Sequence, residues 1–292
     1  MKKVVNFKQI KTINSVSGGK TSSFIAANYP ADLNLFSLVR TEDQNCLFPD
    51  SKIRQIIEDR IQKPFVGTLE DDLIIYTILD LEQFIGQEIK IVSGETYDHI
   101  IQKKGGWLPN KLHRYCTTFL KIEPMFQFWF ENIKEPVEMR IGFRANEINR
   151  MNRMIEKTDH DGFLSYKWTT EKHKDGRNKW KDIAWQKPTF PLIEKRTFKD
   201  EIESFWKDKP VRFAEFNNCV GCFHRNPILL NRMFEKHPNK MNWFLCAEQN
   251  EKKKVGTWRS DVSYEQIKKF RPQLKIEFDQ YDTCDSGYCE NE

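Results

Sequence analysis

The chain of 292 residues lacks any run of about 18 uncharged apolar residues, the length that a membrane-spanning helix needs. Its first residues lack the apolar core of a secretory signal peptide, and the sequence has no internal repeat or low-complexity linker. Neither sign of charge dominates, because the chain has 47 Lys and Arg and 42 Asp and Glu, which gives a net charge of +5. These absences predict a cytoplasmic protein with no membrane partner, and the mild positive charge is compatible with a polyanionic partner.

The chain has enough apolar residues to form a hydrophobic core: hydrophobic residues make up 39% of it and aromatic residues 13%. This composition excludes an intrinsically disordered protein. The seven cysteines are an odd number, and Cys219 and Cys222 form a Cys-x-x-Cys pair. In a chain of cytosolic character, this pattern favours metal or redox chemistry over structural disulfides.

Strand-like and helix-like segments alternate along the N-terminal half of the chain. The predicted strands are residues 11–16, 33–39, 88–92 and 136–141, and helical patterns cover residues 24–28, 50–62 and 71–85. This alternation predicts an α/β fold, with a parallel twisted sheet and helices on both of its faces. The pattern changes after Gly142, so we expect an α/β domain at residues 1–215 and a cysteine-rich C-terminal segment, residues 216–292, packed on it.

Residues 17–22, the serine–glycine loop, lie where the first predicted strand passes into a helix and read Ser-Gly-Gly-Lys-Thr-Ser. Its glycines allow a tight turn with exposed N–H groups, while the hydroxyls, Lys20 and the helix N-terminus also attract anions. A Walker A loop is excluded, because it needs a glycine where this chain has Asn14. The loop is therefore predicted to bind phosphate in another way.

Three further segments follow in order: Phe-Pro-Asp at 48–50, a Cys-Thr, Lys and Pro-Met segment at 116–125, and Gly-x-Arg-x-x-Glu-x-x-Arg at 142–150. Together with the loop, they resemble the phosphoadenosine-phosphosulfate (PAPS) reductase-like family of the adenine-nucleotide α-hydrolases, the PP-loop ATP pyrophosphatases. The resemblance implies an adenine-nucleotide α-hydrolase-like fold with the nucleotide on residues 1–215. It also implies binding of ATP or an adenylylated sulfate, with chemistry at the α-phosphate or the sulfate.

The resemblance also implies a set of nucleotide-binding residues. These are Ser17, Gly18, Gly19, Lys20, Thr21, Ser22, Asp50, Gly142, Arg144, Glu147 and Arg150. Lys20 and Arg144 are candidates for catalysis as well, and arginine can grip phosphate oxygens in a bidentate manner. Glu147 would orient the arginines, unless the three form an ordinary ion pair at a helix start. Asp50 is the candidate carboxylate for Mg²⁺, whereas Thr21 departs from the Asp of many family members.

The Cys-x-x-Cys pair precedes Asn226 and Pro227, a helix-start signal, so we expect its thiols beside a helix N-terminus, where thiolates are favoured. Iron–sulfur members of the family hold a [4Fe–4S] cluster with an earlier cysteine pair and a later Cys-x-x-Cys. By resemblance, three ligands here are Cys116, Cys219 and Cys222.

The fourth ligand is left open, because Thr117 replaces the second cysteine of the earlier pair. Cys246 is our candidate, and the other possible ligands are Cys284, Cys289 and, more weakly, Cys46. A three-ligand cluster with an open iron is an alternative, as in some tRNA thiolation enzymes of the superfamily. Zinc is the alternative metal, since it accepts four thiolates or three with a histidine, and His224 lies two positions after Cys222. The cysteines could also be buried and unligated.

Cys284 and Cys289 lie in a polar tail and have a second candidate role. Family reductases use a nucleophilic cysteine on a C-terminal tail to attack the sulfate sulfur, so either residue is a candidate for catalysis. Neighbouring acidic residues would raise the pKa of these thiols, which counts against an intrinsically activated nucleophile.

Residues 165–187 form a basic aromatic insertion with seven basic and three acidic residues interleaved with tryptophans. Positive charge and stacking surfaces are the two ingredients of single-strand or flipped-base recognition. The alternative is a solvated β-hairpin that turns at Asp175 and Gly176 and packs its tryptophans into the core.

Three functions follow from these features. The first is a PP-loop enzyme that cleaves ATP at the α-phosphate and transfers sulfur to a nucleic acid, either tRNA or DNA, with a sulfur or thiol donor protein. The second is a sulfonucleotide reductase that uses a tail cysteine. The third is a non-catalytic nucleotide- and nucleic-acid-binding accessory protein with structural zinc. A homodimer is compatible with each of them.

Overall fold

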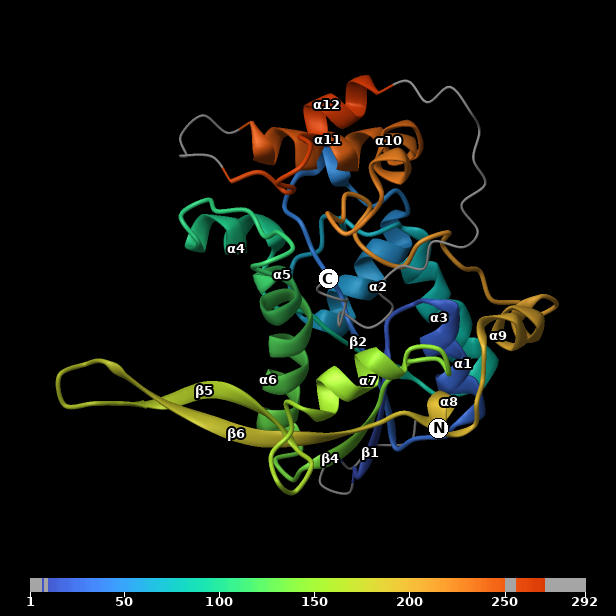
Figure 1. Cartoon of the computed structure of the whole chain (residues 1–292), viewed down its shortest axis with the longest axis vertical. Coiled ribbons are helices and arrows are strands. Elements are labelled where there is room, and N and C mark those ends of the chain that lie inside the picture. The colour runs from blue at the N-terminus through green and yellow to red at the C-terminus, as the bar shows by residue number, and fades with distance from the viewer. Residues whose placement is uncertain (1–6, 8–9, 250–255, 271–292) are drawn as a thin grey trace.

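A six-stranded sheet forms the centre of the computed structural model, which describes residues 7, 10–249 and 256–270 (Figure 1). The strands are β1 (Thr12–Val16), β2 (Leu33–Ser37), β3 (Ile89–Val92), β4 (Val137–Arg140), β5 (Leu164–Lys172) and β6 (Asn178–Thr189). Their order is β3-β2-β1-β4-β6-β5, and all neighbours are parallel except the antiparallel pair β5 and β6. The predicted α/β class and mainly parallel sheet are confirmed.

Strand β1 is the point at which the strand order reverses. On one side Ile13 is in register with Leu33 of β2, and on the other with Met139 of β4. The connections that leave β1 and β4 therefore diverge above the carboxyl ends of these strands. Open α/β sheets bind their ligands at this kind of switch point.

Helices cover both faces of the sheet, as predicted. One face packs against α1 (Lys20–Asn28), α2 (Ser51–Ile61), α3 (Leu73–Ile85) and α9 (Lys199–Trp206), and the other against α6 (Glu123–Asn132) and α7 (Ile148–Ile155). Because side chains alternate along a strand, Val16 joins the first apolar cluster and Ile13 the second.

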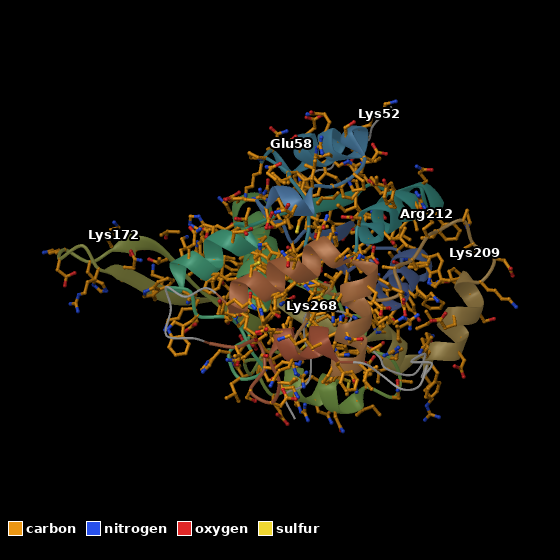
Figure 2. All side chains as sticks on the ribbon, turned by 90° about the horizontal axis from the view of Figure 1, so that it is seen from above. Lys52, Glu58, Lys172, Lys209, Arg212 and Lys268 are labelled. Carbon is orange, nitrogen blue, oxygen red and sulfur yellow. The ribbon has the colours of Figure 1, made fainter. Side chains whose placement is uncertain are left out.

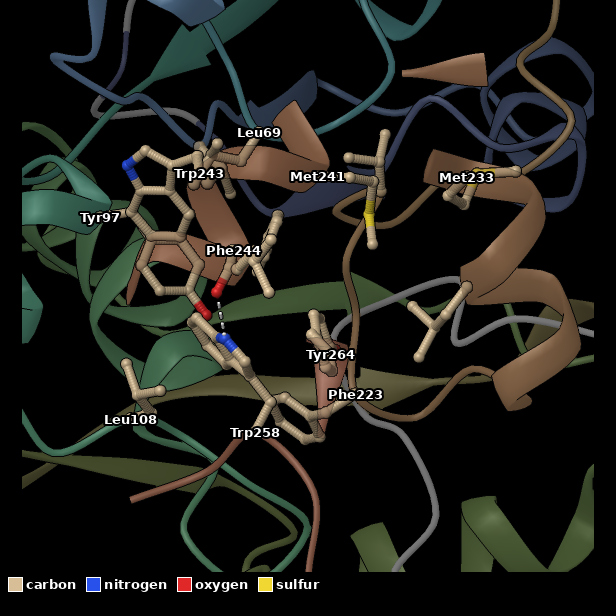
Figure 3. Packing of buried hydrophobic residues seen from close by; sticks show 14 of the residues in the cluster. Leu69, Tyr97, Leu108, Phe223, Met233, Met241, Trp243, Phe244, Trp258 and Tyr264 are labelled. Atoms are coloured by element: carbon tan, nitrogen blue, oxygen red, sulfur yellow. Dashed lines mark hydrogen bonds between the residues drawn. The ribbon is translucent and has the colours of Figure 1, made fainter. Parts of the chain in front are cut away.

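A third apolar cluster joins the C-terminal helices to the segments that follow β2 and β3. It includes residues of α4 (Tyr97–Lys103), α10 (Pro227–Lys236), α11 (Pro238–Glu248) and α12 (Tyr264–Lys269). Figure 3 shows its aromatic centre, where Trp258 Nε1 donates to the carbonyl oxygen of Phe244 over 2.8 Å. The C-terminal helices thus share a core with the α/β part of the chain.

The remaining elements are short helical turns: η2 (Gln44–Cys46), α5 (Tyr115–Thr117), the π-helical turn η3 (Thr118–Ile122) and α8 (Pro191–Glu194). Among the described residues, none of the helices has the length and apolar character required to cross a bilayer.

The basic aromatic insertion is a β-hairpin, as one of the two interpretations predicted. β5 and β6 pair in antiparallel fashion, and Gly176 adopts the left-handed φ of 84° at the turn. The hairpin extends well beyond the body of the molecule, with Lys172 at its far end (Figures 1 and 2). Trp185 is buried at its base, whereas Trp180 is 53% exposed on the arm. The tryptophans are therefore divided between the core and the surface.

Candidate nucleotide and metal site

The serine–glycine loop closes on itself at the carboxyl end of β1. The backbone N–H of Ser17 donates to Ser22 Oγ over 3.0 Å, and the two Oγ atoms lie 2.9 Å apart. Ser22 Oγ also lies 3.2 Å from the carbonyl oxygen of Gly19, to which it donates. Gly19 is the N-cap of α1 and has no side chain with which to cap it. The N-terminus of α1 is thus framed by hydroxyl groups, an arrangement that suits an anion.

Two glycines shape the space around this loop. Gly18 has a left-handed φ of 78°, and a Cβ there would lie 2.6 Å from Ile74 Cγ2 of α3. Gly142 follows β4, and a Cβ on it would lie 3.5 Å from the backbone nitrogen of Ser22. The structure therefore brings the start of the glycine–arginine motif against the first turn of α1.

The guanidinium groups of Arg144 and Arg150 meet at one carboxylate. Glu147 accepts from the backbone nitrogen of Arg144 over 2.8 Å, from Arg144 Nε over 3.1 Å and from Arg150 Nη1. Arg150 also stacks on Phe143, with its guanidinium carbon 4.4 Å from the ring centroid. Glu147 positions both arginines, and the arrangement is also that of an ion pair at a helix start, so their role in nucleotide binding stays a prediction.

Lys20 and Asp50, two further predicted nucleotide-binding residues, both contact other protein groups. Lys20 pairs with Glu203 of α9, and its carbonyl accepts a hydrogen bond from Trp206 Nε1 over 2.9 Å. Asp50 is the N-cap of α2, where one carboxylate oxygen accepts from the backbone nitrogens of Lys52 and Ile53. In this arrangement the amine of Lys20 is engaged by α9, and the carboxylate of Asp50 is engaged by its own helix.

A pocket, which we call the switch-point pocket, opens at the carboxyl ends of the central strands. Its lining includes Ser17 of the serine–glycine loop, Ser37 of β2, Met139 of β4 and Trp185 of β6, together with Lys121 and Met125. It therefore combines hydroxyl groups near the serine–glycine loop with apolar and aromatic side chains.

The segment that carries Cys116 and Lys121 is fixed against the end of β2. Pro124 lacks the N–H group that would bond to the carbonyl of Leu120 in a regular helix, and the turn there is π-helical. Ser37 Oγ donates to that carbonyl instead, over 2.9 Å. A residue of β2 thus holds the backbone beside Lys121 in place.

A second pocket, the cysteine pocket, brings together the three cysteines predicted as metal ligands. Cys116, Cys219 and Cys222 all line it, and His224 and Lys121 line it as well. Its apolar walls are Val39, Tyr97, Leu120, Phe223 and Phe244. Residues that are a hundred positions apart in the sequence therefore share one small cavity.

Distant parts of the chain hold the Cys-x-x-Cys turn. Tyr264 donates its hydroxyl to the carbonyl of Gly221 over 2.8 Å, and Arg259 Nη1 donates to the carbonyl of Phe223 over 2.9 Å. Position 221 favours glycine, because the Cβ of any other residue would lie 2.4 Å from the ring of Phe244. The predicted helix start also holds, because Asn226 accepts from the backbone nitrogen of Ile228 over 2.9 Å.

Burial opposes ionisation of the thiols of Cys116 and Cys219. It raises the pKa of Cys219 well above its usual value, and the nearby Glu70 carboxylate adds to this effect. It also raises the pKa of Cys116, with the neighbouring Cys222 as a second cause. At Cys219, desolvation therefore opposes the thiolate form that its position before a helix was expected to favour. A bound metal would reverse this balance, because it displaces the thiol protons.

His224 is uncharged at neutral pH. Burial, followed by the charges of Arg114, Lys111 and Arg259, lowers the pKa of its imidazole to about 4. A neutral imidazole is the form that coordinates metals.

The remaining cysteines are elsewhere. Cys246 is exposed on α11 and accepts a hydrogen bond from Asn242 Nδ2 over 3.6 Å. Cys46 is buried in the third apolar cluster, where burial raises the pKa of its thiol to about 12. Neither lines the cysteine pocket, while Cys284 and Cys289 lie outside the described residues.

The donor set of the cysteine pocket suits a thiophilic metal. In the ranges that the structure describes, no group of three or more His, Cys, Asp or Glu side chains is arranged so that it could bind a metal ion. Three sulfurs and one imidazole nevertheless line the same cavity, and such donors bind zinc or an iron–sulfur cluster. Metal binding to such donors displaces their protons and is coupled to the folding of the site.

Sequence reasoning missed Glu70 as a neighbour of this pocket. Its Oε1 lies 3.0 Å from Lys121 Nζ, and its backbone pairs with that of Cys219. Burial alone would lower the pKa of Lys121, but the ion pair with Glu70 raises it well above its usual value. No sequence signal singled out Glu70, since only the fold brings it to Lys121.

Comparison with protein-family models, with curated proteins and with solved structures finds no match to this chain.

Proposed function

We propose that this chain is a PAPS reductase-like, PP-loop enzyme of the cytoplasm. It binds ATP with Mg²⁺ at the switch point, cleaves it at the α-phosphate, and uses the metal and thiol site for sulfur transfer to a nucleic acid. Its fold in this proposal is that of the adenine-nucleotide α-hydrolases, with residues 216–292 as a cysteine-bearing elaboration. The four sequence motifs and the placement of the serine–glycine loop at the sheet's switch point support this assignment.

One observation carries the proposal: Lys121 lines both the switch-point pocket and the cysteine pocket. Its ammonium group pairs with Glu70, so it is held between the two cavities as a cation. An adenylylated substrate in the first pocket would therefore lie next to the sulfur groups of the second. Two chemical steps can then follow each other without release of the intermediate.

The proposed sequence of bonds is as follows. An oxygen of the acceptor attacks the α-phosphorus of ATP, and pyrophosphate leaves. A reduced sulfur supplied by a donor protein and delivered through the cysteine pocket then forms a bond to the acceptor carbon, and AMP leaves with the oxygen. Arg144 and Arg150 stabilise charge on the phosphates, as preorganised cations do in phosphate transfer. A metal at the cysteines would hold their sulfurs as thiolates beside this path.

The hairpin supports a nucleic acid as the acceptor. Lys167, Lys172 and Lys174 are exposed along it, and Trp180 offers an open aromatic face on the same arm. Part of the positive charge of the hairpin is neutralised within it, because Lys179 and Lys181 form ion pairs with Glu171. Lysines combined with an exposed indole are suited to phosphate contacts and base stacking.

The test is release of AMP and pyrophosphate from ATP by the full-length protein, purified without oxygen, with RNA, DNA or no acceptor. Acceptor-dependent release supports the proposal, and a variant with Lys172→Ala, Lys174→Ala and Trp180→Ala should bind that acceptor more weakly and with a smaller salt dependence. Lys207→Ala combined with Lys209→Ala, at exposed positions after α9, is the control for loss of two positive charges. Reduction of PAPS without ATP cleavage would instead identify a sulfonucleotide reductase.

A further inference from the structure

We propose that His224 supplies the fourth ligand of the metal centre, through Nε2, together with the sulfurs of Cys116, Cys219 and Cys222. The inference rests on the proposed function, because it concerns the same metal site. It specifies the ligand that the cysteine pattern leaves open.

The first observation is the state of the imidazole. Nε2 of His224 is buried, and it has no hydrogen-bond partner among the described residues. Buried polar atoms in folded proteins nearly always have a partner, so this nitrogen needs an explanation. The same side chain lines the cavity that holds the three sulfurs. A metal ion in that cavity would occupy the lone pair of Nε2.

The second observation is the rigidity of the turn. The backbone nitrogen of Cys222 donates to the carbonyl of Cys219, and that of Arg225 donates to the carbonyl of Cys222, each over 3.0 Å. Arg259 Nη1 also donates to the carbonyl of Arg225, over 2.8 Å. His224 lies inside this braced segment, so three of the four proposed donors belong to one fixed turn. Cys116, the fourth donor, lies on α5.

The third observation is a buried positive charge. Arg225 is only 4% exposed, and its Nε and Nη1 atoms have no hydrogen-bond partner among the described residues. Its remaining nitrogen donates to the carbonyls of Asn218 and Cys219. A buried cation needs a nearby anion. Three thiolates around a divalent metal carry one negative charge in excess, which would provide that anion beside the turn.

The competing ligand has different surroundings. Cys246 is exposed on α11 and accepts a hydrogen bond from Asn242 of its own helix. It does not line the cysteine pocket, whereas His224 does.

Binding of a divalent metal in this way is balanced by proton release. The thiols of Cys116, Cys219 and Cys222 each lose a proton to water as their sulfurs bind the metal. His224 binds as the neutral imidazole, with its proton on Nδ1, and releases none.

The experiment measures metal, not catalysis. Full-length protein is purified without oxygen, its iron, sulfide and zinc are determined, and metal-free protein is titrated with Co²⁺ and with Zn²⁺ against a chromophoric chelator. We compare wild type with His224→Ala, His224→Cys, Cys246→Ser and the double variant Cys284→Ser, Cys289→Ser. Far-ultraviolet circular dichroism checks the fold of each variant.

We expect His224→Ala to lower metal affinity by more than about 100-fold, beyond the effect of losing an outer-shell partner. His224→Cys should restore affinity and shift the Co²⁺ spectrum towards that of four thiolates, which also guards against a simple folding defect. Cys246→Ser and the tail variant should match wild type. Iron and sulfide in the wild type would identify a cluster, and zinc alone a tetrahedral ion, with the same four ligands.

Wild-type metal affinity and an unchanged Co²⁺ spectrum in His224→Ala would overturn the inference. It would also be overturned if Cys246→Ser or the tail variant lost metal as strongly as His224→Ala. These results are separate from the proposed function, whose failure would appear as a metal-bearing protein that does not bind or cleave ATP.

Discussion

The serine–glycine loop and the Cys-x-x-Cys turn are both tight turns ahead of a helix, and both require a glycine. They differ in what holds them. The loop is closed by its own residues, through Ser17 and Ser22, whereas the cysteine turn is held by Tyr264 and Arg259 from another part of the chain. The proposed anion site is therefore encoded in six consecutive residues, while the proposed metal site depends on α12 and the segment before it.

The two glycines show the same difference. Gly18 needs a left-handed backbone and faces Ile74 of the sheet-covering helix α3, whereas Gly221 leaves room for the ring of Phe244 on α11. Damage to one turn should thus leave the other intact, and this independence can be tested.

The largest effect is expected from Cys219→Ser combined with Cys222→Ser. Removal of two thiolates should lower metal affinity by more than about 1000-fold, given the 10–16 kcal/mol typical of structural zinc sites. Metal content and any brown colour of anaerobically purified protein measure this loss, and Cys246→Ser is the control. Nucleotide affinity should remain at the wild-type level, and full retention of iron or zinc would remove both cysteines from the ligand set.

The second-largest effect is expected from Gly18→Ala, which changes the serine–glycine loop. It places a side chain at a left-handed φ and against the stiff, β-branched Ile74, so we expect a loss of about 3 kcal/mol in the free energy of unfolding. Gly176→Ala is the matched control, because its φ is 84° but a Cβ there meets no atom within 4 Å. Denaturant titration compares the two variants, and equal losses would show that the contact with Ile74 is unimportant.

Arg144→Ala should weaken nucleotide binding by well over tenfold, which is more than about 1.4 kcal/mol, if its guanidinium binds the phosphates. Calorimetric titration with a non-hydrolysable ATP analogue measures the change, and Arg153→Ala on the exposed side of α7 is its control. Metal content should not change. An unaltered nucleotide affinity would remove Arg144 from the site and leave it as part of a helix-start ion pair.

Tyr264→Phe should have the smallest effect. The variant removes the hydrogen bond to the carbonyl of Gly221 and leaves that buried oxygen without its donor, at a cost of about 1 kcal/mol. Thermal unfolding with and without metal measures this cost, and the decrease should be larger for the metal-bound protein. If nucleotide affinity fell as much as metal affinity, the two turns would not be independent.

Much of the α/β part could be predicted from the sequence, because its elements obey local rules. The strand expected at residues 88–92 is β3, and the helix expected at residues 50–62 is α2, capped by Asp50. Helix α1 begins earlier than the apolar pattern indicated, at Lys20, because the serine–glycine loop leads directly into it. Side-chain periodicity and caps act over a few residues and are therefore visible in the sequence.

The sequence alone determined the sheet-forming pattern, the loop at the end of the first strand, and three cysteines as a possible set of ligands. Only the tertiary structure decided that these cysteines share a cavity with His224, that Cys246 lies outside it, and that Lys121 lines the switch-point pocket as well. The physical reason is that turns and helices form from neighbouring residues, whereas a buried cavity is defined by segments that meet only when the core packs. Glu70 beside Lys121 and Tyr264 beneath Gly221 are contacts of this second kind.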